Sequence, residues 1–242
     1  MKRVVLGAMG LALGLGLGPA AIPAASLGAS SSSSGQPCEP DGSTTLAETP
    51  AARVYQVERQ RGGHSTLYTY GCLKAFSSQV LLASDAEPAA LFPPPAISLI
   101  GPYVGYAVDT DTDTSSPGGR MTYVEVDDLR PQQPGQERAG LVVSAGPRDV
   151  ARVGSLKVSR QGAVAWIACP APSDGQLAAD PSGACTRPGT YARVYRAVLG
   201  ADGVVHVTLL DKGRAIDPGS MRRVHSGVAW RHAGKTRAVK LR

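Results

Sequence analysis

Hydrophobic residues alternate with polar residues in short runs along this chain, which is the pattern of β-strands. The clearest runs contain Val54, Val57, Leu67, Tyr68, Tyr70, Tyr123, Val124, Val126, Val194, Tyr195, Val205, Val207, Leu209 and Leu210. Only Gly71–Leu82 and Glu87–Leu91 leave room for a helical turn, and Pro93–Pro95 would end the second of these. The pattern, together with many glycines and prolines and few aromatic residues, predicts an all-β fold with tight turns.

One phrase, in which Ser-Leu or Ser-Met leads to Gly and then to Val-Ala-Trp, occurs more than once. It spans Ser155–Trp166 and Ser220–Trp230, and a looser copy spans Ser98–Tyr106. Because alternate residues of a strand share a face, the Val and Trp of each copy should be buried while the intervening Ala contacts a neighbouring sheet. The predicted core residues are Val164, Trp166, Val228 and Trp230.

A second phrase interleaves with the first. Ala52–Tyr55 recurs identically as Ala192–Tyr195, and Tyr123–Val126 occupies the equivalent place between them. The chain therefore starts and ends within a unit, which predicts that its terminal strands pair in a clasp that hides exposed edges. We expect repeat-built antiparallel sheets in a small or partial β-propeller-like fold closed by this clasp. Three full units are fewer than the usual four to eight blades, so a threefold β-barrel or an irregular β-sandwich remain alternatives.

Several stretches support a family resemblance. An early cysteine, the Tyr-Gly-Cys-Leu of Tyr70–Leu73, the strand Gly101–Ala107 and the stretch Leu209–Ser220 together resemble a group of secreted bacterial proteins with β-propeller-blade-like repeats. These motifs are structural, so the resemblance implies a fold and export but assigns no catalytic or ligand-binding residue. The long insert between Trp166 and Tyr191 departs from the group.

The first residues predict export. Lys2 and Arg3 precede the apolar stretch Val4–Leu17, and small residues follow, which is the organisation of a signal peptide over residues 1–29. The apolar stretch is too short for a spanning helix, so we expect no membrane span after cleavage. The Ser-rich residues 30–37 predict a flexible linker, and residues 38–242 a single β repeat domain. The expected location is extracytoplasmic, either secreted or associated with the cell envelope.

Four cysteines remain after the predicted signal peptide: Cys38, Cys72, Cys169 and Cys185. An even number in an exported protein predicts disulfides, and three pairings are open. Sequence proximity favours the two local pairs, Cys38 with Cys72 and Cys169 with Cys185. A zinc site is disfavoured because no C-x-x-C spacing or histidine pair accompanies them.

Alternating aspartates at Asp109, Asp111 and Asp113 form the one candidate metal site. Oxygen ligands at every second residue are typical of the first half of a calcium loop. However, Thr114 and Arg120 stand where an EF-hand loop requires Gly and Glu. The main interpretation is a solvated hairpin tip, with a weak Ca²⁺ site as the alternative and no other cofactor.

The C-terminal end is strongly basic. From Lys212 onward nine Lys or Arg residues accompany one acid (9 − 1 = +8), whereas Cys38–Asp211 contain 14 basic and 18 acidic residues (14 − 18 = −4). The C-terminal basic cluster consists of Arg222, Arg223, Arg231, Lys235, Arg237, Lys240 and Arg242. The main interpretation is that these residues face outward from strands and balance the acidic body. The alternative is a surface for an anionic envelope polymer, a lipid surface or another protein. Export argues against nucleic acid, and the small number of units raises the option of a homo-oligomer.

Candidate catalytic residues are lacking in the sequence. The chain has no G-x-S-x-G elbow, and His225 and Ser226 would point to opposite faces if both lay on a strand. We therefore predict a secreted, non-catalytic binding or scaffolding protein that uses loops on a rigid β frame. The alternative is a secreted hydrolase that acts on an envelope polymer.

Overall fold

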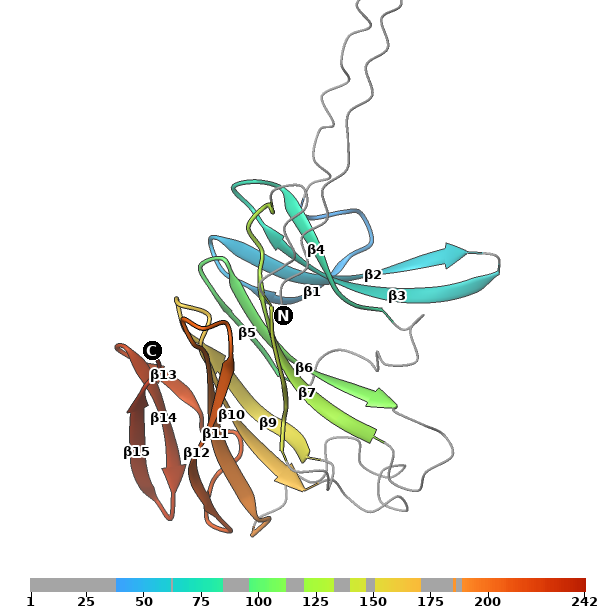
Figure 1. Cartoon of the computed structure of the whole chain (residues 1–242). Coiled ribbons are helices and arrows are strands. Elements are labelled where there is room, and N and C mark those ends of the chain that lie inside the picture. The colour runs from blue at the N-terminus through green and yellow to red at the C-terminus, as the bar shows by residue number, and fades with distance from the viewer. Residues whose placement is uncertain are drawn as a thin grey trace, which may run out of the picture. The chain divides into compact units, whose positions relative to one another are not determined.

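Antiparallel β-sheets make up the described part of the chain in a computed structural model (Figure 1). The structure describes residues 38–61, 63–84, 96–111, 120–132, 140–146, 151–170, 185 and 189–242. The predicted signal peptide (1–29) and linker (30–37) lie outside the described residues. Residues Gly35–Arg242 form one compact unit, and the description below concerns this unit alone.

The described residues form fifteen strands in four sheets, and within each sheet the spatial order of the strands follows the chain. Sheet A contains β1 (Thr44–Glu48), β2 (Ala52–Arg61), β3 (His64–Leu73) and β4 (Ser78–Ser84). Sheet B contains β5 (Ile97–Ile100), β6 (Tyr103–Asp111), β7 (Arg120–Asp128) and β8 (Leu141–Ser144). Sheet C contains β9 (Ala151–Val158), β10 (Val164–Pro170), β11 (Ala192–Leu199) and β12 (Val205–Gly213). Sheet D contains β13 (Arg222–Val224), β14 (Gly227–His232) and β15 (Lys235–Lys240). Among these residues, no helix is long and apolar enough to cross a membrane.

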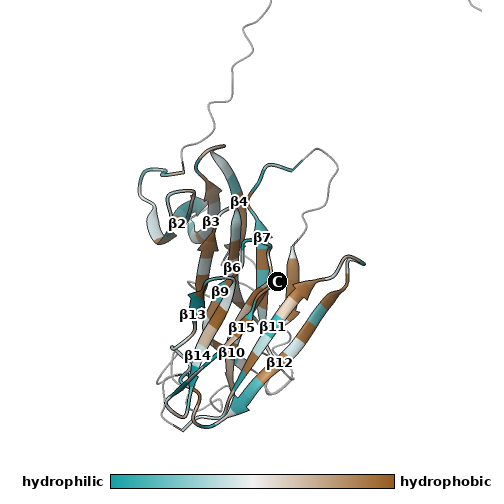
Figure 2. Cartoon of the chain, turned by 90° about the vertical axis from the view of Figure 1, so that its left-hand side faces the viewer, coloured by the Kyte–Doolittle hydropathy of each residue, from teal (hydrophilic) through white to brown (hydrophobic). Residues whose placement is uncertain are grey.

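The sheets stack in the order A, B, C, D, with a hydrophobic cluster between each neighbouring pair. Val54 of β2 and Tyr106 of β6 share the A–B cluster, and Val124 of β7 and Trp166 of β10 share the B–C cluster. The C–D cluster joins Ala165 of β10 to residues of sheet D. Strand β10, inside sheet C, is therefore buried on both faces, because its alternate side chains point to opposite neighbouring sheets. The edge strand β12 is largely exposed. Figure 2 shows apolar and polar residues mixed along the strands.

The repeated phrase builds the first hairpin of sheets B, C and D, namely β5–β6, β9–β10 and β13–β14. The predicted core is confirmed: Val164, Trp166 and Val228 are fully buried, and Trp230 is only 4% exposed. In each copy the aromatic residue also contacts the last strand of the preceding sheet. Tyr106 Oη lies 3.3 Å from Leu82 O of β4. Trp166 Nε1 donates to Ala145 O just after β8 (2.8 Å), and Trp230 Nε1 donates to Asp211 Oδ2 of β12 (2.8 Å). The phrase thus specifies how one sheet attaches to the sheet before it.

The looser copy of the phrase has Gly105 where the others have alanine, and the packing explains the difference. A Cβ atom at Gly105 would meet Leu156 Cδ2 at 3.0 Å and Val158 Cβ at 3.3 Å, both on sheet C. Sheets B and C therefore approach more closely at this point than an alanine would allow. In sheet C the equivalent Ala165 is fully buried in the C–D cluster, as predicted for the intervening alanines.

The second phrase marks equivalent places in sheets B and C but not in sheet A, and this corrects the predicted clasp. Tyr123–Val126 lies in β7, the third strand of sheet B. Ala52–Tyr55 lies in the second strand of sheet A, whereas Ala192–Tyr195 lies in the third strand of sheet C. Sheet A already has four strands of its own, so β1 pairs with β2, and β15 pairs with β14 in sheet D. The terminal strands of the described chain belong to different sheets because each sheet is a complete local meander. Gly71–Leu82 forms strand, turn and strand, and residues 87–91 lie outside the described residues.

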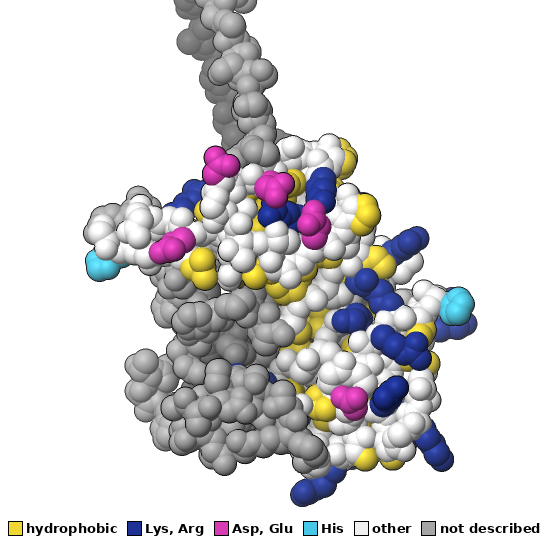
Figure 3. Space-filling view, turned by 180° about the vertical axis from the view of Figure 1, so that it is seen from behind, with side chains coloured by type: hydrophobic (Ala, Val, Ile, Leu, Met, Phe, Trp, Pro, Cys, Tyr) yellow, Lys and Arg dark blue, Asp and Glu magenta, His cyan; other side chains and the backbone are white. Residues whose placement is uncertain are grey.

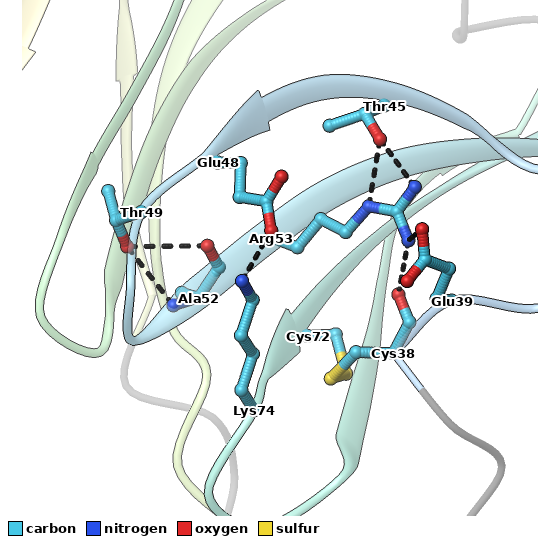
Figure 4. A network of polar contacts seen from close by, with 9 residues as sticks. All are labelled: Cys38, Glu39, Thr45, Glu48, Thr49, Ala52, Arg53, Cys72 and Lys74. Atoms are coloured by element: carbon cyan, nitrogen blue, oxygen red, sulfur yellow. Dashed lines mark hydrogen bonds and ion pairs between the residues drawn. A yellow bond between two sulfur atoms is a disulfide. The ribbon is translucent and has the colours of Figure 1, made fainter.

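Two disulfides join the local pairs of cysteines. Cys38 bonds to Cys72 at the end of β3, and Cys169 of β10 bonds to Cys185. The first disulfide acts with Arg53 of β2 to hold the N-terminal arm on sheet A (Figure 4). The guanidinium group of Arg53 donates to Cys38 O (3.1 Å) and to Thr45 Oγ1 (2.9 Å), and it forms an ion pair with Glu39 (3.3 Å). Covalent and polar contacts therefore fix the start of the described chain.

Candidate anion-binding site

The predicted calcium site is only partly visible in the structure. Asp109 and Asp111 lie at the end of β6, but their side chains and all of Asp113 fall outside the described residues. In the part of the chain that the structure describes, no group of three His, Cys, Asp or Glu residues is arranged to hold a metal ion. The Ca²⁺ site therefore stays a prediction.

The C-terminal basic cluster lies on and just after sheet D, and all seven side chains are exposed. Figure 3 shows many Lys and Arg side chains over the side of the molecule where sheet D lies, whereas most of the acidic residues in this view lie toward the other end, over sheet A. Strand register divides the cluster between two faces. Arg222 is paired with Ala229, and Lys240 with Gly227, so these cations share with Arg231 the face that points away from sheet C. No described sheet covers that face.

Arg223 points the other way and binds across three sheets. Its Nη2 donates to Ser98 Oγ and to Leu99 O of β5, both at 2.7 Å, and its Nε donates to Val158 O of β9 at 3.2 Å. Ser98 Oγ also accepts the backbone N–H of Val158 at 3.1 Å. The guanidinium group on β13 of sheet D is thereby fixed against sheets B and C, and its position is set by neutral acceptors.

A cavity of about 450 Å³ opens where β5, the β9–β10 turn, the β13–β14 turn and the end of the chain meet. Its polar lining includes the three arginines Arg160, Arg223 and Arg242, together with Gln161, His225 and Ser226. The apolar residues Ile100, Val158 and Leu241 also line it, although the side chain of Val158 is fully buried in the B–C cluster. None of the described lining residues is Asp or Glu, so the cavity concentrates positive charge.

Two pKa shifts report the electrostatic cost of this arrangement. Burial lowers the pKa of Arg223, since its guanidinium group is partly removed from water. The pKa of Lys157 on β9 is lowered by burial and also by the positive charge of Arg223. Cations that repel one another and lack a carboxylate partner favour binding of an anion, because an anion would restore the lost stabilisation.

His225 and Ser226 differ from the sequence-based expectation that they face opposite ways. They form the two-residue turn between Val224 and Gly227, which are paired in the β13–β14 hairpin, and both line the cavity. His225 has φ of 38°, a left-handed conformation that costs free energy in residues other than glycine. The turn thus brings a histidine and a hydroxyl group to the same side.

The acidic residue on the strands of sheet C, Asp211, is buried and already has donors within the fold. Asp211 Oδ2 accepts from Trp230 Nε1 and lies 2.9 Å from His232 Nδ1, and Oδ1 accepts from Arg237 Nη1 at 2.9 Å. Burial by itself would raise the pKa of Asp211. The hydrogen bonds of Trp230, His232 and the Lys212 amide outweigh burial, and the pKa is lowered. Asp211 therefore neutralises Arg237 within the fold.

A second acidic arrangement lies between sheets A and B. The buried hydroxyl group of Tyr106 is 2.8 Å from Glu125 Oε2 and 2.7 Å from Asp127 Oδ2. Burial raises the pKa of Glu125, and the nearby charge of Asp127 acts in the same direction against the hydrogen bond of Tyr106. Neither carboxylate lines the basic cavity. The paired acids that hydrolysis would require are thus not combined with this cavity.

The chain was compared with known proteins. No protein-family model matches it, and the search of curated proteins found no match either. Inference about function therefore depends on the geometry of the site.

Sequence reasoning found the basic cluster but missed the cavity residues Val158 and Arg160. It also missed Ser98, which holds Arg223 in place. Arg223 and Ser98 are 125 residues apart in the chain, so no local pattern links them. One signal was available: Ser98 belongs to the repeated phrase, and so does Ser155, whose hydroxyl group bonds to Pro218 O just before sheet D. A polar residue at the same place in two copies indicates a contact with the next unit.

Proposed function

We propose that this protein is an extracytoplasmic, non-catalytic binding module that recognises an anionic polymer of the cell envelope through sheet D and the adjoining cavity. The observation that carries this proposal is the exposed C-terminal basic cluster beside a cavity whose described lining contains three arginines and no acid. An excess of one charge sign on a surface attracts oppositely charged partners and raises their local concentration. The two disulfides are consistent with an extracytoplasmic location.

We also propose that sheets A to D correspond to blades of a partial, open β-propeller, in keeping with the resemblance to secreted bacterial repeat proteins. Two observations support this: the same phrase starts sheets B, C and D, and β5 lies against both β1 and β9. First strands that lie side by side are arranged as in the centre of a propeller. The hydrolase alternative gains no support from the basic cavity, since the acid pair at Tyr106 lies elsewhere.

A binding titration tests the proposed function. The purified protein is titrated with poly(glycerol phosphate), with polygalacturonate and with neutral dextran. We expect saturable binding of an anionic polymer that weakens about tenfold or more between about 50 mM and about 500 mM NaCl, because salt screens exposed charges. Dextran should not bind.

A matched pair of double variants tests which end of the molecule binds the polymer. Arg231→Ala with Lys235→Ala removes two charges from sheet D, and Arg59→Ala with Lys74→Ala removes two charges from sheet A. We expect the first pair to weaken polymer binding and the second to leave it unchanged. Absence of binding to both anionic polymers, or equal binding of dextran, would overturn the proposal.

A further inference from the structure

The cavity itself differs from the rest of the basic surface in how its central cation is held. Arg223 is fixed by three acceptors on β5 and β9, whereas Arg222 and Arg231 extend from the outer face of sheet D. A fixed guanidinium group loses little conformational freedom on binding, and this favours a ligand group of defined geometry. A flexible cation on an open face contributes mainly long-range attraction.

The hydrogen-bonding capacity left on Arg223 indicates where a ligand would lie. Its Nε and Nη2 donate to the protein, and Nη1 has no hydrogen-bond partner among the described residues. Because Arg223 lines the cavity, the two N–H groups on Nη1 are the donors left for a bound group. All three acceptors are neutral, so the positive charge of Arg223 is not cancelled.

Other donors surround the same space. Arg160 and Gln161 come from the β9–β10 turn, Ser226 comes from the β13–β14 turn, and Arg242 lies beyond β15. Donors that converge from several directions suit a group with several acceptor oxygens and more than one negative charge, as in phosphate or sulfate. A planar carboxylate has two oxygens and one charge, and it would leave part of this donor set unsatisfied.

The volume of the cavity indicates how large the whole ligand can be. A volume of about 450 Å³ lies in the usual range for small-molecule pockets and exceeds what a lone oxyanion fills. The partly exposed Ile100 provides an apolar surface for the part of the ligand that carries the charged group.

We infer that this cavity is a subsite for a tetrahedral oxyanion, phosphate or sulfate, borne on a small unit such as one repeat of the envelope polymer. The inference rests on the proposed function and gives it a specific chemistry. The outer face of sheet D then supplies general attraction for the polymer, and the cavity selects the charged group.

Calorimetric titration of the purified protein with glycerol 3-phosphate, inorganic phosphate, inorganic sulfate and acetate tests this inference. We expect one saturable site for a tetrahedral anion and at least about tenfold weaker binding of acetate. Comparison of phosphate with sulfate identifies the preferred oxyanion. Tighter binding of glycerol 3-phosphate than of inorganic phosphate would show that the carrier unit is also recognised, as the apolar wall implies.

Two charge-matched variants separate the cavity from the surface. Arg160→Ala removes a cavity arginine from an exposed turn, and Arg231→Ala removes one arginine from the outer face. We expect Arg160→Ala to weaken binding of the small oxyanion about tenfold and Arg231→Ala to leave it unchanged. The variant Arg223→Lys keeps the charge but loses the fork of donors, and it should weaken oxyanion binding without abolishing polymer binding.

Absence of saturable oxyanion binding, equal affinity for acetate, or equal affinity in Arg160→Ala and wild type would overturn the inference. If the anionic polymer still bound in any of these cases, the proposed function would stand without the subsite. If the wild-type protein bound neither anionic polymer, the proposed function itself would be contradicted.

Discussion

Sheets A and D form the two ends of the stack, and they differ in whether their Lys and Arg side chains have partners within the fold. On sheet A, Arg53 forms an ion pair with Glu39 and Lys74 forms one with Glu48. Arg59 lies over the rings of Tyr68 and Tyr70, at 5.8 Å and 5.7 Å from their centroids. On sheet D, Arg237 is the one member of the C-terminal basic cluster that pairs with a described acid. Arg53, Lys74 and Arg59 on sheet A thus have partners within the fold. On sheet D, the cluster members other than Arg237 have no ion-pair partner among the described acids.

The two ends also differ in how they are secured. Sheet A has four strands and a disulfide to the N-terminal arm, whereas sheet D has three strands and is attached through Trp230, Arg223 and the C–D cluster. The attachment of sheet D therefore depends on side chains that also border the charged site. Stability and binding are thus coupled at sheet D and separate at sheet A.

The largest expected effect comes from Trp230→Ala, which removes the aromatic anchor of sheet D. We expect a loss of about 3–5 kcal/mol in the free energy of unfolding, the range for a buried aromatic side chain. Urea denaturation followed by circular dichroism measures it, with Val207→Ala as a control at a valine that is 49% exposed. A loss as small as that of the control would show that sheet D does not depend on this anchor.

Removal of the disulfide on sheet A is next in size. The double variant Cys38→Ser with Cys72→Ser opens a loop with a sequence separation of 34, and the chain-entropy model gives a loss of about 4 kcal/mol. The melting temperature should fall while affinity for the anionic polymer stays at the wild-type value at low temperature. A parallel loss of affinity would mean that the two ends are not separate.

The substitution Asp211→Asn tests the contact between sheets C and D through the pH dependence of the free energy of unfolding. The pKa of Asp211 is lowered in the folded protein, so its contribution is present above the ordinary carboxyl pKa and is lost as pH falls through the folded value. We expect the variant to be less stable by about 2 kcal/mol at neutral pH and the difference to shrink in acid. Chemical denaturation over a pH series measures this. A difference that stayed constant with pH would contradict the assigned role.

The substitution Glu125→Gln tests the contact between sheets A and B. Its effect on the free energy of unfolding should be opposite in sign to that of Asp211→Asn. The pKa of Glu125 is raised, so ionisation of this group opposes folding as pH rises above the ordinary carboxyl value. The glutamine variant should therefore gain about 1 kcal/mol at neutral pH and nothing in acid, where Glu125 is protonated. Equal stability of both proteins at neutral pH would contradict a raised pKa of Glu125, which burial causes first and the charge of Asp127 adds to.

The smallest expected effect is that of single exposed lysines on binding. Lys235→Ala on sheet D should weaken binding of the anionic polymer about twofold, and Lys74→Ala on sheet A should leave it unchanged. Titrations at low salt with both variants measure the difference. Equal effects of the two changes would mean that net charge, and not its location, governs binding.

The sequence predicted the local features of the fold well. Alternation placed Trp166 and Trp230 in the core, and composition indicated β-strands and turns throughout. These predictions succeed because strand periodicity and burial are encoded by neighbouring residues. The same reasoning failed for the second phrase, since the apolar pattern of Ala52–Tyr55 fits either a second or a third strand of a meander. The clasp inferred from that phrase was therefore wrong.

The candidate site could be predicted only in part, because its residues meet through tertiary contacts. The charge of the C-terminal end was visible in the sequence, and the structure divides it between an outer face and a cavity. The contact of Arg223 with Ser98, and the turn that brings His225 and Ser226 to one side, require the packing of sheet D on sheets B and C. No spacing in the chain encodes that geometry.

The most direct test of the central claim is hydrogen exchange of backbone amides with and without a saturating anionic polymer. The contrast between the two ends predicts slower exchange in peptides that cover Arg222–Arg242 and the β9–β10 turn, and no change over Thr44–Ser84. Protection confined to sheet A, or uniform protection across all four sheets, would contradict the claim that the unpaired cations of sheet D form the binding surface.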